Sequence, residues 1–247
     1  MNRFVLAAVI ALGCAAPAAA QSFSDPQREE IGKIVREYLL KHPEVLQEAI
    51  SELEKRQATA DADKARGAIA THAELLFNSP RQVTLGNPQG DVTFVEFFDY
   101  NCGYCKRALD DMMQLMSKDS KLKVVLKEFP VLGPASVEVA QIAVAVRMQD
   151  KTGGKKYLEF HQKLLSGRGQ VDRARAMAVV KEIGLDAARI ERDMKSEEVT
   201  KTLDESMKLA EALGMNGTPS YVIGKEIVIG AVGLQALAQK IQAARQQ

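Results

Sequence analysis

Short apolar runs alternate with segments of helical periodicity along most of the chain. The runs are rich in Val, Ile, Leu and Phe, which favours strands, and they cover 82–85, 92–98, 122–128, 220–223 and 226–229. The last two flank Gly224-Lys225 and predict a hairpin. Helical patterns follow the second strand and close the chain at 234–244. Strands that alternate with helices predict an α/β fold, with a mixed sheet covered on both faces.

A long helical stretch separates the third strand from the hairpin. It runs from about 134 to 213 and is interrupted at 151–154, 167–169 and Gly184. We therefore expect a domain over 78–247, built on the sheet and carrying a helical insertion at about 134–213.

Residues from about 25 to 77 differ from this domain, because they are rich in Ala, Glu, Lys, Arg and Gln and carry little strand signal. One helical face gathers Ile31, Ile34, Val35, Tyr38 and Leu39. Isolated helices with such a narrow apolar face cannot bury enough surface to be stable alone. The helices fold back on their own domain or pack on copies of themselves. We favour self-association, which makes 21–77 an oligomerisation segment and the protein a homo-oligomer, with a trimer as one candidate state.

The first twenty residues have the features of a signal peptide. Arg3 supplies the positive charge, 4–12 the apolar segment and 18–20 a small-residue cleavage site. The segment 11–14 faintly resembles a lipoprotein box that ends at Cys14, but alanine stands where leucine is usual. We therefore expect cleavage near residue 20, export to the periplasm and no lipid anchor.

The charges of the chain are almost balanced. It has 33 basic and 32 acidic residues, and Arg3 leaves with the signal peptide. A neutral mature protein argues against a nucleic-acid partner. No second apolar segment is long enough to span a membrane.

Two of the three cysteines lie in Cys102-Gly103-Tyr104-Cys105, between a predicted strand and a predicted helix. This position places the first sulfur at a helix N-terminus, where unpaired N–H groups and the helix dipole stabilise a thiolate. The second sulfur follows one turn later, within reach of a disulfide. The motif predicts a redox-active disulfide, with Cys102 as nucleophile and Cys105 as resolving thiol.

Other roles for the cysteines are less well supported. A zinc site needs further thiolates or histidines, and His42, His72 and His161 are scattered singly, so we expect no metal and no cofactor. A purely structural disulfide would close too short a loop to stabilise much. Two thiolates can bind Cu(I), which leaves a copper-handling protein as an alternative. A third possibility is a scaffold whose cysteines have lost their role.

Three segments carry a resemblance to a known family: 94–105 with the cysteine motif, 128–134 (Glu-Phe-Pro-Val-Leu-Gly-Pro), and Gly-Thr-Pro-Ser at 217–220. Together they resemble the DsbA family, a thioredoxin fold with a helical insertion, from about Gln82 to the C-terminus. Residues 36–46 resemble the N-terminal extension of the ScsC subgroup (suppressor of copper sensitivity), some members of which oligomerise through this region.

The resemblance assigns further site residues. Pro219 matches the family's cis-proline, so that the backbone of Thr218 would pair with an extended substrate, with Gly103 and Tyr104 completing the substrate-binding surface. The alternative is an ordinary turn proline. Glu96 matches a buried acid that relays a proton to Cys105, unless its side chain points outward.

Three further residues receive simpler roles. We expect Asp99 and Tyr100 to shape the rim of the site and His161 to pack in the insertion.

The favoured function is a periplasmic thiol-disulfide oxidoreductase, a disulfide isomerase or reductase that acts on unfolded or misoxidised exported proteins. It would be kept reduced by a membrane partner of the DsbD or ScsB type. The alternative is a DsbA-like oxidase served by a DsbB-type partner. DsbA oxidases carry Pro-His between the cysteines, and Gly103-Tyr104 departs from that pattern.

Overall fold

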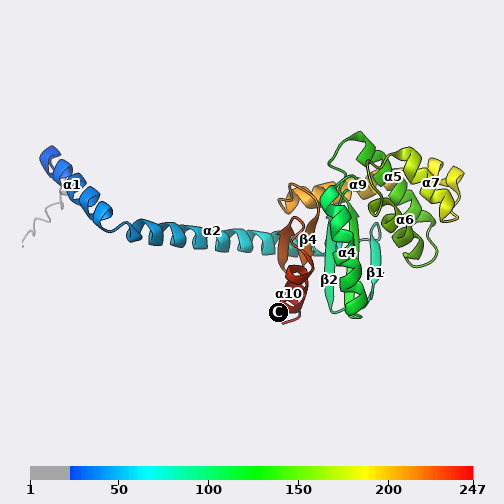
Figure 1. Cartoon of the computed structure of the whole chain (residues 1–247), viewed down its shortest axis with the longest axis horizontal. Helices are drawn as coiled ribbons and strands as arrows, with labels where there is room; N and C mark the ends of the chain where they lie inside the picture. Colours follow the sequence, from blue (N-terminus) through cyan, green and yellow to red (C-terminus); the bar gives the residue numbers. More distant parts are fainter. Residues whose placement is uncertain (1–22, 247) are drawn as a thin grey trace, which may run out of the picture. The chain divides into compact units, whose positions relative to one another are not determined.

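The computed structural model describes residues 23–246, so the predicted signal peptide and Cys14 lie outside the described residues. The chain divides into two compact units between Gln57 and Ala58. The second unit contains the sheet and the helical insertion (Figure 1). Both cysteines of the motif also belong to it.

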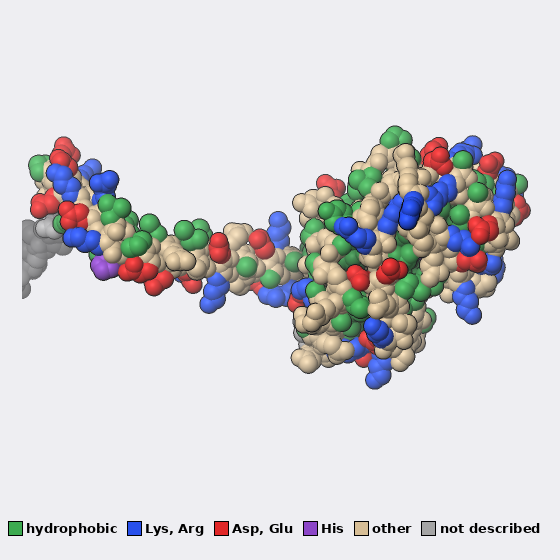
Figure 2. All heavy atoms as spheres, in the orientation of Figure 1, with side chains coloured by type: hydrophobic (Ala, Val, Ile, Leu, Met, Phe, Trp, Pro, Cys, Tyr) green, Lys and Arg blue, Asp and Glu red, His purple; other side chains and the backbone are tan. Residues whose placement is uncertain are grey.

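The N-terminal region is helical, as expected. Helix α1 (Asp25–Lys41) begins with a capping box between Ser24 and Gln27, and α2 (Glu44–Thr71) begins directly after Pro43. Hydrophobic side chains lie on the surface of both helices (Figure 2). Eight of them are 42–68% exposed: Ile31, Ile34, Val35, Tyr38, Leu40, Leu46, Ile50 and Leu53.

The second unit is built on one five-stranded mixed sheet. Its strands are β1 (Val83–Gly86), β2 (Val92–Phe98), β3 (Leu122–Glu128), β4 (Ser220–Ile223) and β5 (Glu226–Ile229), in the order β1-β3-β2-β4-β5. The central strands β2 and β3 are parallel, and every other pair is antiparallel. Four strands match the predicted ranges, and β1 begins one residue later than predicted.

The insertion consists of five helices: α5 (Pro134–Gln149), α6 (Lys155–Leu165), α7 (Arg173–Glu182), α8 (Ala187–Asp193) and α9 (Glu197–Ala212). The predicted interruptions are present. One more lies between α8 and α9, where Ser196 caps the new helix. Among residues 23–246, no helix is long and apolar enough to cross a membrane.

Strand alternation gives the sheet two apolar faces. Phe94 and Phe98 of β2 pack with α4 (Gly103–Lys118) and α10 (Leu234–Ala244), whereas Val95 and Phe97 point to the opposite face. The second face is covered by α9, by Ile69 near the end of α2 and by α3 (Ala73–Phe77). Residues just before β1 therefore contribute to the core of the sheet domain.

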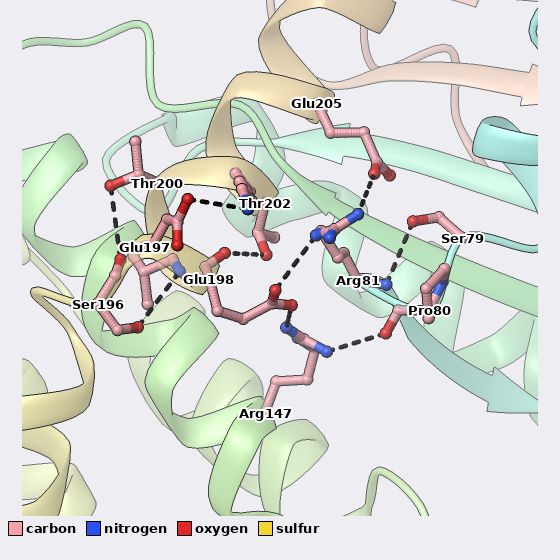
Figure 3. Close-up of polar contacts among 12 residues, drawn as sticks. Ser79, Pro80, Arg81, Arg147, Ser196, Glu197, Glu198, Thr200, Thr202 and Glu205 are labelled. Atoms are coloured by element: carbon pink, nitrogen blue, oxygen red, sulfur yellow. Dashed lines mark hydrogen bonds and ion pairs between the residues drawn. The ribbon is translucent and has the colours of Figure 1, made fainter.

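A network of charged side chains attaches α9 to its neighbours (Figure 3). Arg81 donates to Glu198 over 3.2 Å and lies 3.6 Å from Glu205. Arg147 of α5 donates to Glu198 and to the backbone carbonyl of Pro80, both over 3.0 Å. The network joins the insertion to the segment that leads into the first strand.

Two lysines of β3 bind the C-terminal end of α3. Lys127 is buried and donates to the carbonyl of Leu75 over 2.7 Å, and Lys123 donates to that of Phe77 over 2.7 Å. Burial lowers the pKa of Lys127 to about 8, which the nearby Glu205 carboxylate partly offsets. The cations compensate carbonyls that a helix end leaves unpaired.

We expect Lys127→Ala to lower the free energy of unfolding by about 2 to 4 kcal/mol, because it leaves Glu205 and a helix-end carbonyl without their buried partner. Urea unfolding followed by circular dichroism measures this. Lys123→Ala, at a half-buried position on the same strand, is the matched control and should cost about 1 kcal/mol. Equal losses for the two variants would contradict the role of burial.

Candidate active site

The cysteine motif lies where β2 ends and α4 begins. Cys102 is the N-cap of α4, and its Sγ accepts a hydrogen bond from the backbone N–H of Cys105 over 3.4 Å. Its side chain is almost covered, with 6% of the residue exposed. The sulfur thus takes the position of a capping oxygen and receives the positive end of the helix dipole.

The two thiols have opposite acidities. A hydrogen bond from the Cys105 thiol lowers the pKa of Cys102 to about 5, against an opposing effect of burial. Burial raises the pKa of Cys105 well above the ordinary range for a thiol, and its hydrogen bond to Cys102 adds to the rise. At neutral pH this pair presents a Cys102 thiolate above a protonated Cys105.

The loop before β4 faces the first sulfur. The Thr218–Pro219 peptide bond is cis, as expected from the resemblance. The Sγ of Cys102 lies 3.1 Å from the carbonyl oxygen of Thr218, to which it donates in its protonated form. Ser220 ties the loop back on itself, because its hydroxyl donates to the carbonyl of Gly217 over 2.6 Å. The loop is therefore ordered beside the reactive atom.

The two residues between the cysteines face outward. Tyr104 is 58% exposed, and the guanidinium of Arg107 lies 4.5 Å from the centre of its ring. Gly103 is exposed, and a Cβ built on it would meet no atom within 4 Å. This surface is open to an incoming polypeptide.

Glu96 is buried within β2 and does not point outward. It lies on the strand face that packs against α4, the face of Phe94 and Phe98. Burial raises the pKa of Glu96 to about 8, and the negative charges of Asp111 and Cys102 add to the rise. The structure therefore joins a thiolate, a buried thiol, a cis-proline loop and a buried acid at one end of the sheet.

Comparisons with known proteins agree with this geometry. Residues 93–242 match the model of the DSBA-like thioredoxin domain, which covers more than half of the chain. This chain belongs to the DSBA-like thioredoxin domain family. Residues 27–60 match the model of the copper resistance protein ScsC N-terminal domain.

Solved structures support the same assignment. A thioredoxin-like oxidoreductase from Silicibacter pomeroyi is 41% identical over 70% of this chain and 98% of its own, with a TM-score of 0.67. Proteus mirabilis ScsC, in a transitional conformation, is 29% identical over 91% of this chain and 99% of its own, with a TM-score of 0.65. The DSBA-like domain of this chain is thus a thiol-disulfide oxidoreductase domain of the DsbA/ScsC type.

Curated relatives include the thiol:disulfide interchange protein DsbA of Bordetella pertussis, 25% identical over 55% of this chain and 64% of the relative. Others are much longer proteins. The Na⁺/H⁺ antiporter NhaA 1 of Salinispora arenicola is 22% identical over 161 residues, and the chain spans about a quarter of its length.

Two residues of the DSBA-like domain differ from the rim positions expected from sequence. Asp99 is buried, and its carboxylate accepts four hydrogen bonds of 2.7–3.0 Å. The donors are the backbone N–H groups of Asn101, Val131 and Leu132 and the hydroxyl of Ser136. These hydrogen bonds hold the residues that lead into the insertion against the residues that lead into the cysteine motif.

Tyr100 is also buried, as part of a polar chain inside the domain. Its hydroxyl lies 3.5 Å from that of Tyr157, which in turn donates to Glu128. His161 packs edge-on against Phe98, and burial lowers its pKa to about 3, which fits the packing role expected for it.

Two contacts of the DSBA-like domain had no clear signal in the sequence. Asn101 pairs with the backbone of Val171 through both its amide groups, over 2.7 and 3.0 Å. Lys106 donates to the carbonyls of Gly167 and Gly169, over 3.2 and 2.6 Å. Both join the start of α4 to a glycine-rich loop of the insertion. In the part of the chain that the structure describes, no three His, Cys, Asp or Glu side chains form a group able to hold a metal ion.

Titration of the reduced protein should show thiolate absorbance rising with a midpoint near pH 5, because the Cys105 thiol and then the helix-start N–H groups stabilise the Cys102 anion. Cys102→Ser should remove this step. Cys105→Ala should move the midpoint upward, since it deletes the thiol donor. A midpoint at the free-thiol value of about 8.5 in the parent protein would show that the helix start does not act on the sulfur.

Proposed function

We propose that this chain is a periplasmic thiol-disulfide isomerase or reductase that acts on misoxidised client proteins. The observation that carries the proposal is the Cys102 sulfur, which caps α4 and lies 3.1 Å from the Thr218 carbonyl, above a buried Cys105 thiol. A thiolate at neutral pH is what attack on a client disulfide requires.

The reaction follows from the two acidities. The Cys102 thiolate attacks one sulfur of a client disulfide, a mixed disulfide forms, and the other client sulfur leaves as a thiolate. In isomerisation that thiolate attacks elsewhere in the client, which finally releases Cys102 unchanged. In reduction the Cys105 sulfur attacks Cys102, and the client leaves with both cysteines reduced. The backbone of Thr218, beside Pro219, would align the client, with Gly103 and Tyr104 as contacts.

Isomerisation requires the dithiol form, and a stabilised Cys102 thiolate favours that form. A membrane reductant of the DsbD or ScsB type would then maintain it. An oxidase needs the disulfide form and a DsbB-type partner. The redox state of the two cysteines in freshly exported protein distinguishes these alternatives, and we expect them to be reduced. Copper handling remains an alternative, and the only support for it is the description of the ScsC N-terminal domain as part of a copper resistance protein. The match to that family model covers residues 27–60, which contain neither Cys102 nor Cys105.

The proposed location rests on relatives and on the N-terminus. One neighbour, 26% identical, is a periplasmic thioredoxin-like protein from Salmonella enterica. Positions 1–20 have signal-peptide character. An exported protein would meet the oxidised clients that the reaction needs.

We expect Cys102→Ala to abolish thiol-disulfide exchange, because the attacking sulfur is gone, and Cys105→Ala to accumulate mixed disulfides that cannot be resolved. Non-reducing gels of cell extracts, followed by reduction, measure both. Trapped complexes through Cys105 in the Cys102→Ala variant, with none through Cys102, would reverse the two roles.

We further propose that α1 and the start of α2 assemble copies of the chain, for example as a trimer. Their exposed stripe has no partner within the described part of the N-terminal unit, where α1 buries none of its side chains. Covering it would contribute about 25 cal/mol per Å² of apolar surface. Assembly would also bring several active sites to one client at high effective concentration, which favours isomerisation.

Replacing Ile34 and Ile50 together by Asn should convert the oligomer to a monomer, because it interrupts the stripe on both helices. Arg36→Asn with Glu48→Asn is the polar control and should leave assembly intact. A chain starting at Ala58, where the second unit begins, should be monomeric and retain reductase activity while losing most isomerase activity. Light scattering and refolding of a scrambled substrate measure these outcomes. A parent protein that is monomeric at micromolar concentration would overturn the assembly proposal.

A further inference from the structure

Tyr221 lies beside the buried acid. In the β2–β4 pairing, Glu96 and Tyr221 are direct antiparallel partners. Partners that face each other on neighbouring strands project to the same side of a sheet, with their Cβ atoms about 5 Å apart. The side in question is the one covered by α4, since Tyr221 belongs to the same apolar cluster as Phe94 and Cys105. Glu96 and the Tyr221 ring therefore lie together beneath the resolving cysteine.

The Tyr221 hydroxyl is an unusual feature of this cluster. The residue is 1% exposed, and its ring packs on Phe94 with centroids 5.1 Å apart. Its hydroxyl oxygen is buried and makes no hydrogen bond within the described chain. A buried hydroxyl without a partner is costly, so the position needs an explanation. A phenylalanine would fill the same space without this cost. Burial raises the pKa of the Tyr221 hydroxyl above its ordinary range, and the ionisable groups of Glu96, Cys105, Asp111 and Cys102 add to the rise.

Asp111 connects the cluster to the surface. It lies on α4 and is half-buried. Burial raises the pKa of Asp111, and the backbone of Leu234, the first residue of α10, partly offsets that rise. The charge of Asp111 acts on both Glu96 and Tyr221, although it is six residues beyond Cys105. A half-buried carboxylate whose charge acts on a buried acid is suited to exchange protons between that acid and solvent.

Other charged groups lie on α4 and on the elements packed against β2. Glu128 of β3 binds Tyr157, and Lys240 of α10 forms an ion pair with Glu226 over 2.7 Å. Asp110 of α4 is exposed. Among residues 23–246, the charges of Asp111 and Cys102 raise the pKa of Glu96, and Glu96 in turn raises the pKa of Cys105 and of Tyr221.

We propose that the Tyr221 hydroxyl and the Asp111 carboxylate complete the Glu96 site: Tyr221 donates to Glu96 when it ionises, and Asp111 passes its proton to solvent. The inference rests on the proposed thiol-disulfide exchange and adds two residues that act through Glu96. Tyr221 and Asp111 are positioning residues, and neither touches the client.

The step they serve is the resolution of the mixed disulfide. The Cys105 thiol gives its proton to the Glu96 carboxylate, and its sulfur attacks the Cys102 sulfur. The Cys102–Cys105 bond forms, the bond from Cys102 to the client sulfur breaks, and that sulfur leaves with the electron pair as a thiolate. The client disulfide is the oxidant, so no further reagent is needed. Glu96 then returns its proton to solvent through Asp111.

The test separates the two chemical steps in the full-length protein. Reduced protein is mixed with an aromatic disulfide that releases a coloured thiolate. A first release reports attack by Cys102, and a second reports resolution by Cys105. The rate of the second release is followed against pH in the parent, in Tyr221→Phe and in Asp111→Asn. Asp110→Asn removes a charge from the adjacent exposed position and is the matched control.

We expect opposite shifts in the pH at which the second rate rises. Asp111→Asn should move it down by about one pH unit, because a negative charge no longer opposes ionisation of Glu96. Tyr221→Phe should move it up, because the ionised acid loses its donor, and should slow the second release about tenfold at neutral pH. The first release should change less than twofold, and Asp110→Asn should match the parent. In a Glu96→Gln background, neither substitution should have a further effect.

Unchanged profiles, or shifts in the same direction for both variants, would overturn the inference while leaving the proposed exchange intact. A parent protein without a second release would overturn both. Infrared titration of the protonated Glu96 carboxyl, assigned with Glu96→Gln, tests the same point by a second measurement. The pH midpoint of this titration should shift in each variant in the same direction as the kinetic profile. A midpoint that is unchanged in Asp111→Asn would also overturn the inference.

Discussion

The contact between the Cys102 sulfur and the first turn of α4 is the interaction on which the chemistry of this molecule depends. A helix start leaves N–H groups without partners, and here the cap is a sulfur that accepts the N–H of Cys105. The same contact places the second thiol beneath the first, inside the core. One local geometry thus produces an acidic thiol and a protected one within four residues.

The surroundings keep that geometry in place. Asp99 collects four donors from the approach to the motif and from the start of the insertion, and Asn101 binds the backbone on the far side of a glycine-rich loop. Buried polar groups that are fully satisfied stabilise one arrangement over others. The insertion therefore has a structural role at the active site, because its first loop and the loop after α6 both bind residues next to Cys102.

The sheet gives its two faces different tasks. The face with Glu96 and Tyr221 lies under α4 and contains the ionisable groups of the site. The opposite face binds α9 and the last turns before β1, where Lys123 and Lys127 hold the end of α3. A residue's parity along β2 decides which face it serves, because successive side chains of a strand alternate. The segment between Ala58 and β1 therefore belongs to the sheet domain, although it precedes the first strand.

Sequence alone determined the elements and the reactive pair. Apolar runs and turn residues predicted all five strands, the helical insertion and the helix that opens at Cys102, since these depend on local periodicity and on residues close in the chain. The match of three short segments added Pro219 and Glu96. The tertiary structure decided what depends on contacts between distant residues. Asp99 and Tyr100 are buried, against expectation, because three of the four donors to Asp99 and the Tyr157 partner of Tyr100 lie 32 or more residues away. Tyr221 reaches Glu96 only through the β2–β4 register, and a shift of one residue would point it to the other face.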